Sequence, residues 1–89
     1  MDFEWDENKN QKNISKHGVD FNQAKEVFSD KKRTISPDQR ANYGEDRWKT
    51  VGSILGAIFS VIYTIRQTTI RIISARKANK KERRDYFNQ

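Results

Sequence analysis

The first third of the chain is mostly polar, and its few hydrophobic residues fall in short runs. Phe3 and Trp5 alternate as on one face of a short strand. The polar segment 7–17 lies between Asp6, a typical N-cap residue, and Gly18, a typical helix stop. We therefore predict a surface helix that begins at Glu7 and ends near His17. Its narrow contact stripe is expected to consist of Asn10, Ile14 and His17.

The next segment carries the signals of a second, short helix. Asp20 and Gln23 form a pattern like a capping box. Val19 and Ala24 occupy the positions of a hydrophobic staple. The apolar residues that follow keep helical spacing until the polar segment 29–32 interrupts it. We expect this helix to dock on the core.

From Arg33 onward, extended segments separated by turn residues replace the helical pattern. We predict strands over 34–36, 47–55, 57–66 and 69–76. Gly56 provides the turn between the second and third of these strands, whereas the turn at Gln67 and Thr68 lacks a glycine. The last three strands therefore form an antiparallel meander, whose central strand is apolar on both faces.

A last helix is predicted over 80–87, because Asn79 stands three residues before Glu82 as in a capped helix start. Tyr86 and Phe87 are available to dock it. Together these elements predict an α+β fold, with two N-terminal helices packed on a small, mainly antiparallel sheet and a short C-terminal helix. Eighty-nine residues suffice for one core, so we expect a single domain over 1–89.

Charge is spread unevenly along the chain, which has a net charge of +6. Residues 1–30 carry four Lys and seven acids, whereas 31–89 carry fourteen Lys or Arg and five acids. Between Arg66 and Arg84 there are eight cations and one acid. Such a surface indicates that the partner is a phosphate-bearing molecule or an acidic protein, although a solvated charged face is the simpler alternative.

Several classes of function lack support in the sequence. There is no Cys, no acidic and His cluster with metal-ligand spacing, no Gly-rich phosphate loop and no nucleophile elbow, so we expect no metal and no cofactor. The start is acidic where a signal peptide is basic and then apolar, and the most apolar stretch, 51–65, is too short to span a bilayer. We expect a cytoplasmic protein with no membrane partner.

The chemistry that these exclusions leave open is suited to the cleavage of RNA. RNA can be cut without a metal when its own 2′-hydroxyl attacks the neighbouring phosphate, given a proton acceptor, a proton donor and cations that stabilise the phosphoryl charge. Arg76 and Lys77 end a strand just before a helix, where a rigid scaffold can hold cations. Strand alternation predicts Ser74 and Arg76 on one face and Arg71 on the other.

Three residues are candidates for proton transfer, each with a structural alternative. His17 is the only imidazole, but in the last turn of a helix it can also stabilise the helix dipole. Glu45 stands beside Arg47 and can act as a base next to a phosphate-binding cation, or form a surface ion pair. Tyr86 can donate a proton, or pack the last helix on the core.

The segments 3–9, 13–21, 27–30 and 70–78, together with Ala24, 45–47 and 82–86, form a combination that spans nearly the whole chain. In that combination the sequence resembles the BrnT family of toxins. The loop 37–44 departs from the family pattern, and we assign it no catalytic role.

The resemblance implies a RelE-like fold and ribonuclease toxicity, directed at mRNA and translation. It also implies an antitoxin with a ribbon-helix-helix DNA-binding domain, in a complex of two toxins and two antitoxins that contacts DNA only through the antitoxin. The matched positions imply these catalytic candidates, ranked with Arg76 first: Arg76, Lys77, His17, Glu45, Arg47 and Tyr86. Other basic residues are candidates for RNA binding: Arg66, Arg71, Lys80, Lys81, Arg83 and Arg84.

Two other hypotheses explain the charge. One is a non-catalytic module whose basic face only binds RNA or the antitoxin. The other is a DNA-binding helix-turn-helix protein, for which the sequence lacks a convincing pair of recognition helices.

Overall fold

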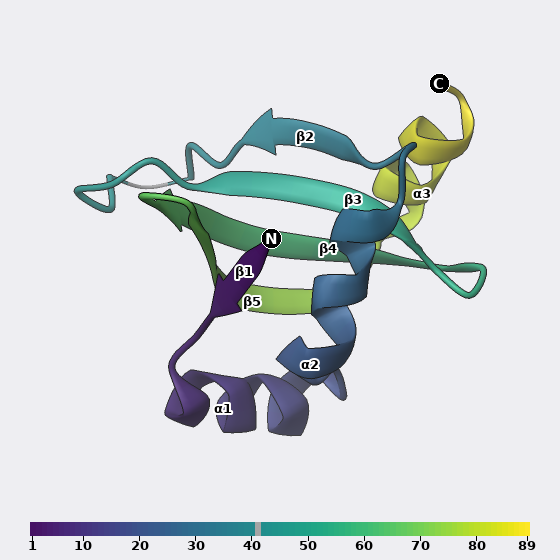
Figure 1. Ribbon diagram of the computed structural model, residues 1–89. Helices are drawn as coiled ribbons and strands as arrows, with labels where there is room; N and C mark the ends of the chain where they lie inside the picture. Colours follow the sequence, from purple (N-terminus) through teal and green to yellow (C-terminus); the bar gives the residue numbers. More distant parts are fainter. Residues whose placement is uncertain (41) are drawn as a thin grey trace.

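Five strands form one mixed sheet in the computed structural model, which describes residues 1–40 and 42–89 (Figure 1). The strands are β1 (Asp2–Glu4), β2 (Thr34–Pro37), β3 (Trp48–Ile54), β4 (Ala57–Arg66) and β5 (Thr69–Lys77). Their order across the sheet is β1-β5-β4-β3-β2. Only β1 and β5 run parallel, and the other three pairings are antiparallel. The predicted α+β class and the mainly antiparallel sheet are confirmed.

The meander β3-β4-β5 matches the predicted strands, and its turns use left-handed backbone conformations. Leu55 and Gly56 have φ values of 49° and 87°, as the tight turn between β3 and β4 requires. The second turn has no glycine, and Gln67 takes a φ of 57° there. The polar side chain of Gln67 is exposed in this turn.

Helix α1 (Glu7–His17) has the predicted ends: the Asp6 side chain accepts from the amides of Asn8 and Lys9, and Gly18 is left-handed. The predicted short second helix is present in two parts. Helix α2 (Phe21–Ala24) makes one turn and continues as a 3-10 helix, η1 (Lys25–Ser29). Asp20 caps it through the amide of Asn22, in place of the predicted capping box with Gln23.

The core lies between this second helical segment and one face of the sheet, which we call the helix face. Within this core the ring of Phe28 lies edge-on to Phe3 at 5.3 Å and to Tyr63 at 5.0 Å between centroids. The buried residues of this cluster are Val19, Phe21, Ala24, Val27, Phe28, Phe59, Val61, Tyr63, Ile70, Ile72 and Ala75.

Helix α1 attaches to the rest of the fold through asparagines, which corrects the predicted stripe. Asn10 and Asn13 are buried, whereas His17 is exposed. The Asn13 amide donates to the carbonyl of Ala75 at 2.8 Å, and its oxygen accepts from the Ala75 amide at 3.1 Å. Since β1 pairs only with the first three residues of β5, Asn13 takes the place of a strand neighbour further along. The buried backbone of β5 is thereby satisfied.

A bulge in β5 changes which residues share a face. The ladder between β4 and β5 shifts where Ile62 pairs with Ser74 and Tyr63 pairs with Ile72, so Ile73 is the extra residue. Ile72 and Ala75 therefore both enter the core. The prediction that Arg71 and Arg76 face opposite sides is wrong. The bulge interrupts the alternation of side chains along β5, and as a result both residues face away from the helix face.

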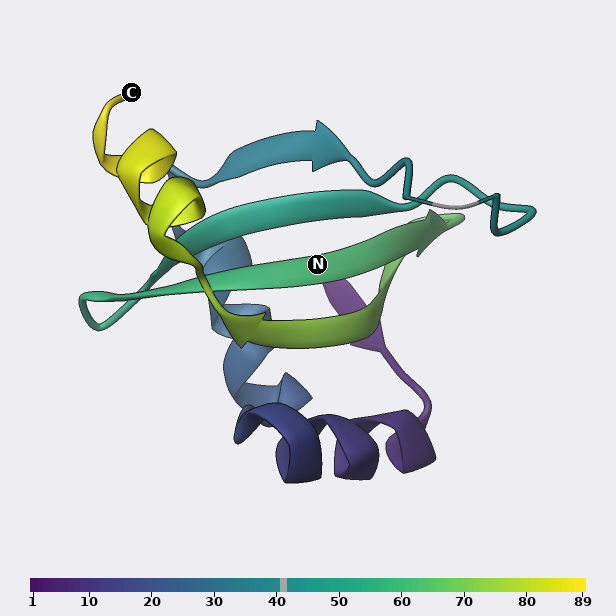
Figure 2. The same ribbon diagram turned by 180° about the vertical axis from the view of Figure 1, so that it is seen from behind.

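Helix α3 (Lys80–Phe87) lies on the other face, which we call the open face. The predicted cap at Asn79 is formed, as a capping box with Glu82. It packs through a small apolar cluster of Val51, Ile58, Ala78 and Tyr86. Phe87, which we expected to dock the helix, is exposed. Figure 2 shows α3 crossing the end of the sheet next to the β3-β4 turn, while the rest of this face carries no helix.

Candidate active site

A cleft of about 680 Å³ lies on the part of the open face that α3 leaves uncovered. Strands, the end of α1 and the segment after β2 all contribute to its wall: Lys16, His17, Ser36, Pro37, Asp38, Gln39, Arg40, Lys49, Ser60, Ile62, Ser74, Ala75 and Arg76. Among these described residues, four are Lys or Arg and Asp38 is the single acid. The cleft therefore attracts anions.

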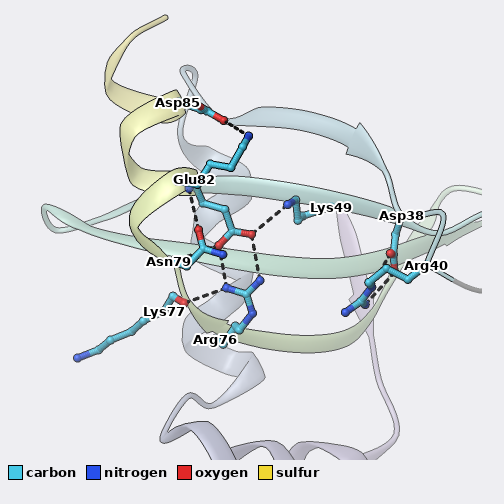
Figure 3. A network of polar contacts seen from close by, with 9 residues as sticks. Asp38, Arg40, Lys49, Arg76, Lys77, Asn79, Glu82 and Asp85 are labelled. Atoms are coloured by element: carbon cyan, nitrogen blue, oxygen red, sulfur yellow. Dashed lines mark hydrogen bonds and ion pairs between the residues drawn. The ribbon is translucent and has the colours of Figure 1, made fainter.

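A buried carboxylate holds two of the cations at one end of this cleft (Figure 3). Arg76 donates to both oxygens of Glu82 in a bidentate pair, at 2.7 and 3.0 Å. The Lys49 ammonium lies 3.0 Å from the same carboxylate. Glu82 also accepts from the amide of Asn79, which is the capping-box bond. The network thus connects β3, β5 and the first turn of α3.

Glu82 is ionised throughout the neutral range. Burial alone would raise the pKa of Glu82, but the hydrogen bonds from Arg76, the Asn79 amide and Lys49 outweigh it and lower the pKa to about 2. Its side chain is 7% exposed, against 38% for Arg76 and 34% for Lys49. The cations therefore reach solvent in the cleft while their counter-charge stays beneath the surface.

His17 stands at the edge of the cleft, at the exposed end of α1. It shares that edge with Lys16 and also borders a smaller hollow beside α1 that includes Lys9 and Lys12. The structure therefore brings the one imidazole of the chain and Arg76, two of the candidates from sequence, to the same cleft.

The loop to which we assigned no catalytic role forms part of the cleft. Arg40 makes a bidentate pair with Asp38, at 2.7 and 2.9 Å. The hydrogen bond from Arg40 is the main cause of the lowered pKa of the Asp38 carboxyl. This pair leaves the Arg40 side chain exposed, so it adds a cation opposite Arg76 (Figure 3).

Glu45 and Arg47 border a neighbouring cavity of about 540 Å³, which shares the segment 37–39 with the cleft. Glu45 pairs with Arg47 at 3.3 Å and with Arg66 at 3.4 Å. Desolvation would raise the pKa of Glu45, but these two partners lower it. The Arg47 guanidinium lies 3.8 Å over the ring of Tyr43. A carboxylate with a lowered pKa is a weak base, so this group favours binding over proton transfer.

Tyr86 lies outside both cavities. It is buried in the apolar cluster under α3, and its hydroxyl donates to Asp30 at 2.5 Å. That hydrogen bond, together with burial, raises the pKa of Tyr86 to about 12. The contacts of Tyr86 are those of a residue that docks α3 on the core.

The other basic candidates lie outside the cleft. Lys77 points away from the network, and its carbonyl accepts from Arg76 (Figure 3). Arg71 pairs with Glu4 of β1 at 2.6 Å. On α3, Lys81 and Arg84 pair with Asp85, Arg83 donates to the carbonyl of Ala78, and Lys80 is exposed. None of these residues lines the cleft in the described part of the chain.

Sequence reasoning missed Lys49 and the ionic role of Glu82. Glu82 was recognised only as a capping residue, and the excess of cations around it was the one further signal. Lys49 is a single cation in a strand, 33 residues from Glu82, and has no local pattern that marks it. Only the pairing of β3 with β4, which sets Lys49 opposite Ile62 on the open face, brings it to the site.

Two further observations concern other kinds of site. Within 1–40 and 42–89, no three His, Asp or Glu side chains gather in an arrangement that could hold a metal ion. Over the same residues, no helix has the length and apolar character needed to cross a bilayer.

An α+β fold with a cationic cleft on an uncovered part of its sheet defines the class of this protein by structure, and such a cleft suits phosphate groups. Comparison with protein families is more specific: residues 5–82 match the family described as the ribonuclease toxin BrnT of type II toxin-antitoxin systems. Because the match covers most of the chain, the protein belongs to the BrnT family of ribonuclease toxins, and the resemblance seen in the sequence is confirmed. An antitoxin protein is therefore its partner. Comparison with curated proteins gives no match.

Proposed function

We propose that this protein is a metal-independent endoribonuclease that binds mRNA in the open-face cleft, cuts it and thereby stops translation in the cytoplasm. The observation that carries the proposal is the cluster of partly exposed cations on that face, with Arg76 and Lys49 held by a buried carboxylate. RNA phosphates require such cations, and Arg binds them in a bidentate way.

The reaction follows from RNA's own chemistry. The 2′-hydroxyl oxygen forms a bond to the adjacent phosphorus, and the bond from phosphorus to the 5′-oxygen of the next nucleotide breaks. The products are a 2′,3′-cyclic phosphate and a 5′-hydroxyl. One group takes the proton of the 2′-hydroxyl, and another gives a proton to the leaving oxygen. Arg76 and Lys49 stabilise the charge on the phosphoryl oxygens in the transition state.

His17 is the one imidazole of the chain and lines the cleft, and we assign one of these two proton transfers to it. Glu45 and Arg47, in the neighbouring cavity, contact the adjoining nucleotide, with the stacked Arg47 and Tyr43 as a platform. Lys77 and the basic residues of α3 extend the positive surface along the RNA backbone. We place Tyr86 outside the reaction, because its hydroxyl is engaged by Asp30.

The antitoxin and the fold family complete the proposal. We propose that the antitoxin carries a ribbon-helix-helix DNA-binding domain, that two toxins assemble with two antitoxins, and that DNA is contacted only through the antitoxin. We also propose that residues 1–89 form a single RelE-like domain. The meander, with the second helical segment on its helix face and α3 at one end of its open face, supports this. A short reading frame with a ribbon-helix-helix pattern beside the gene is the first observation to seek.

The direct test is cleavage of RNA by purified, antitoxin-free protein, with and without ribosomes, in the presence of a metal chelator. We expect cut RNA that ends in a 2′,3′-cyclic phosphate, and no cleavage where a single 2′-deoxy nucleotide replaces the attacking one. Arg76→Ala should lower the cleavage rate by about 100-fold or more. The matched control is Lys31→Ala, which removes an exposed cation from the turn after η1, outside the cleft.

The alternative is a module that binds RNA without cutting it, and the exposure of His17 at the edge of the cleft favours it. Salt-dependent RNA binding by protein that leaves RNA intact under all the conditions above would establish this alternative and refute the enzyme.

A further inference from the structure

We infer that Glu82 is the positioning residue of the reaction, which fixes Arg76 and Lys49 in the geometry that receives the phosphate. This inference rests on the proposed function. It assigns to Glu82 a task beyond capping α3, and it makes the first turn of that helix a part of the active site.

The bonds of Glu82 exceed what a helix cap needs. Capping uses one carboxylate oxygen, Oε1, which accepts from the Asn79 amide at 2.9 Å. The second oxygen, Oε2, accepts from an Arg76 NH2 group and from Lys49 Nζ, each at 3.0 Å. The carboxylate therefore has one oxygen shared between the helix and Arg76 and one oxygen given entirely to cations.

The shared oxygen brings two like charges together. Since Arg76 and Lys49 both lie 3.0 Å from Oε2, their bonded nitrogens are no more than about 6 Å apart. Two cations this close repel each other, and an anion between them offsets that repulsion. Glu82 is that anion, and it is 7% exposed, so water does not replace it.

The arrangement leaves donors for a substrate. A guanidinium has five N–H donors, and Arg76 uses three of them, two to Glu82 and one to the Lys77 carbonyl, among the described residues. An ammonium has three donors, and Lys49 uses one. The remaining donors belong to cations that line the cleft. Held in place before substrate arrives, they need little reorganisation during the reaction.

Glu82→Gln tests this inference, because the amide keeps the size of the side chain and an oxygen for the Asn79 cap but removes the charge. Asn79→Ala is the matched control, since it removes the cap bond to the Glu82 amide and leaves the carboxylate in place. We expect Glu82→Gln to lower kcat by about 30- to 100-fold through misplacement of the cations.

Binding separates positioning from loss of structure. A 2′-deoxy oligonucleotide, which cannot be cut, should bind Glu82→Gln as tightly as wild type or more tightly at low salt, because a negative charge has been removed. Asn79→Ala should keep the wild-type kcat per folded molecule. Should Glu82→Gln fail to fold, Glu82→Asp replaces it: the charge remains, the reach shortens, and kcat should fall while oligonucleotide binding stays within about 3-fold of wild type.

The inference is overturned if Glu82→Gln, or Glu82→Asp in its place, keeps kcat within about 3-fold of wild type, or if Asn79→Ala loses as much kcat as the Glu82 variant. It is also overturned if the loss of kcat is matched by an equal loss of oligonucleotide binding. Failure of the proposed function gives a different result: wild type leaves RNA intact, or Arg76→Ala cuts it normally. If the Glu82 variant is active while Arg76→Ala is inactive, the inference about Glu82 fails and the proposed function stands.

Discussion

Two carboxylates anchor opposite ends of α3, and they differ in the donors they accept. Asp30 accepts from neutral groups, the Tyr86 hydroxyl and the amides of Ser53 and Lys32. Glu82 accepts from two cations as well as from the Asn79 amide. Asp30 therefore ties the end of the helix to η1 and β3, whereas Glu82 ties its beginning to the cleft.

The difference separates a part of the molecule that maintains the fold from a part that carries chemistry. The neutral donors around Asp30 form hydrogen bonds that hold backbone and side chain together. Tyr86 also belongs to the apolar cluster there. Charged donors around Glu82 keep unused N–H groups in a cleft. We therefore expect substitutions at the Asp30 end to lower stability, and substitutions at the Glu82 end to lower activity.

The largest expected effect is that of Asp30→Ala on stability. It leaves the Tyr86 hydroxyl and the Ser53 amide without their acceptor, which costs about 2–4 kcal/mol in the free energy of unfolding. Urea denaturation at pH 7 measures this change. The folded fraction should still cut RNA with the wild-type kcat, and a loss of stability below about 1 kcal/mol would refute the structural role given to Asp30.

Lys49→Ala should produce the reverse pattern. We expect kcat for RNA cleavage to fall by about 10- to 30-fold, less than for Arg76→Ala, because the ammonium is a point charge and the guanidinium is a bidentate donor. The free energy of unfolding should change by less than about 1 kcal/mol, since the ion pair is partly exposed. Lys31→Ala serves again as control. If Lys49→Ala cut RNA as fast as Lys31→Ala, Lys49 would not belong to the active site.

Tyr86→Phe is expected to have a smaller effect, confined to stability. It removes the hydroxyl that donates to Asp30 and keeps the ring that packs under α3, so the free energy of unfolding should fall by about 1–1.5 kcal/mol. RNA cleavage per folded molecule, measured at saturating substrate, should not change. If the turnover rate of the folded variant fell by about 10-fold or more, Tyr86 would be shown to transfer a proton, the role considered from the sequence.

A further effect concerns acid conditions. Folding lowers the pKa of Glu82 from 4.5 to about 2, so its contribution to stability is present above about pH 4.5 and is lost as the pH falls toward 2. The difference in unfolding free energy between wild type and Glu82→Gln should therefore be constant from pH 7 to about 5 and shrink below that. Urea denaturation across this range measures it, and a difference that stays constant down to about pH 3 would contradict the ionic network.

The sequence predicted the features that depend on neighbouring residues. Asp6, Gly18 and Asn79 mark helix ends through contacts within one turn, and Gly56 marks a hairpin turn in the same local way. The strands of the meander follow from these boundaries and from their apolar residues. The family resemblance depended on a combination of segments, and it was confirmed over 5–82.

Features created by contacts between distant residues could not be predicted. The bulge at Ile73 arises from pairing with β4, and it turns Arg71 to the same side as Arg76. Asn13 is a polar residue that is buried because it replaces a strand neighbour at Ala75, 62 residues away. Lys49 joins the site for a similar reason, since only the assembled sheet places it beside Glu82.

The most direct test of the open-face cleft as the RNA site is NMR chemical-shift mapping with the uncuttable 2′-deoxy oligonucleotide. We expect the largest shifts at amides in the cleft, with Lys49, Ser74 and Arg76 foremost, and little change at Asp30 and Tyr86. Shifts concentrated around Asp30 and Tyr86, with the amides of the cleft unchanged, would contradict the placement of the RNA.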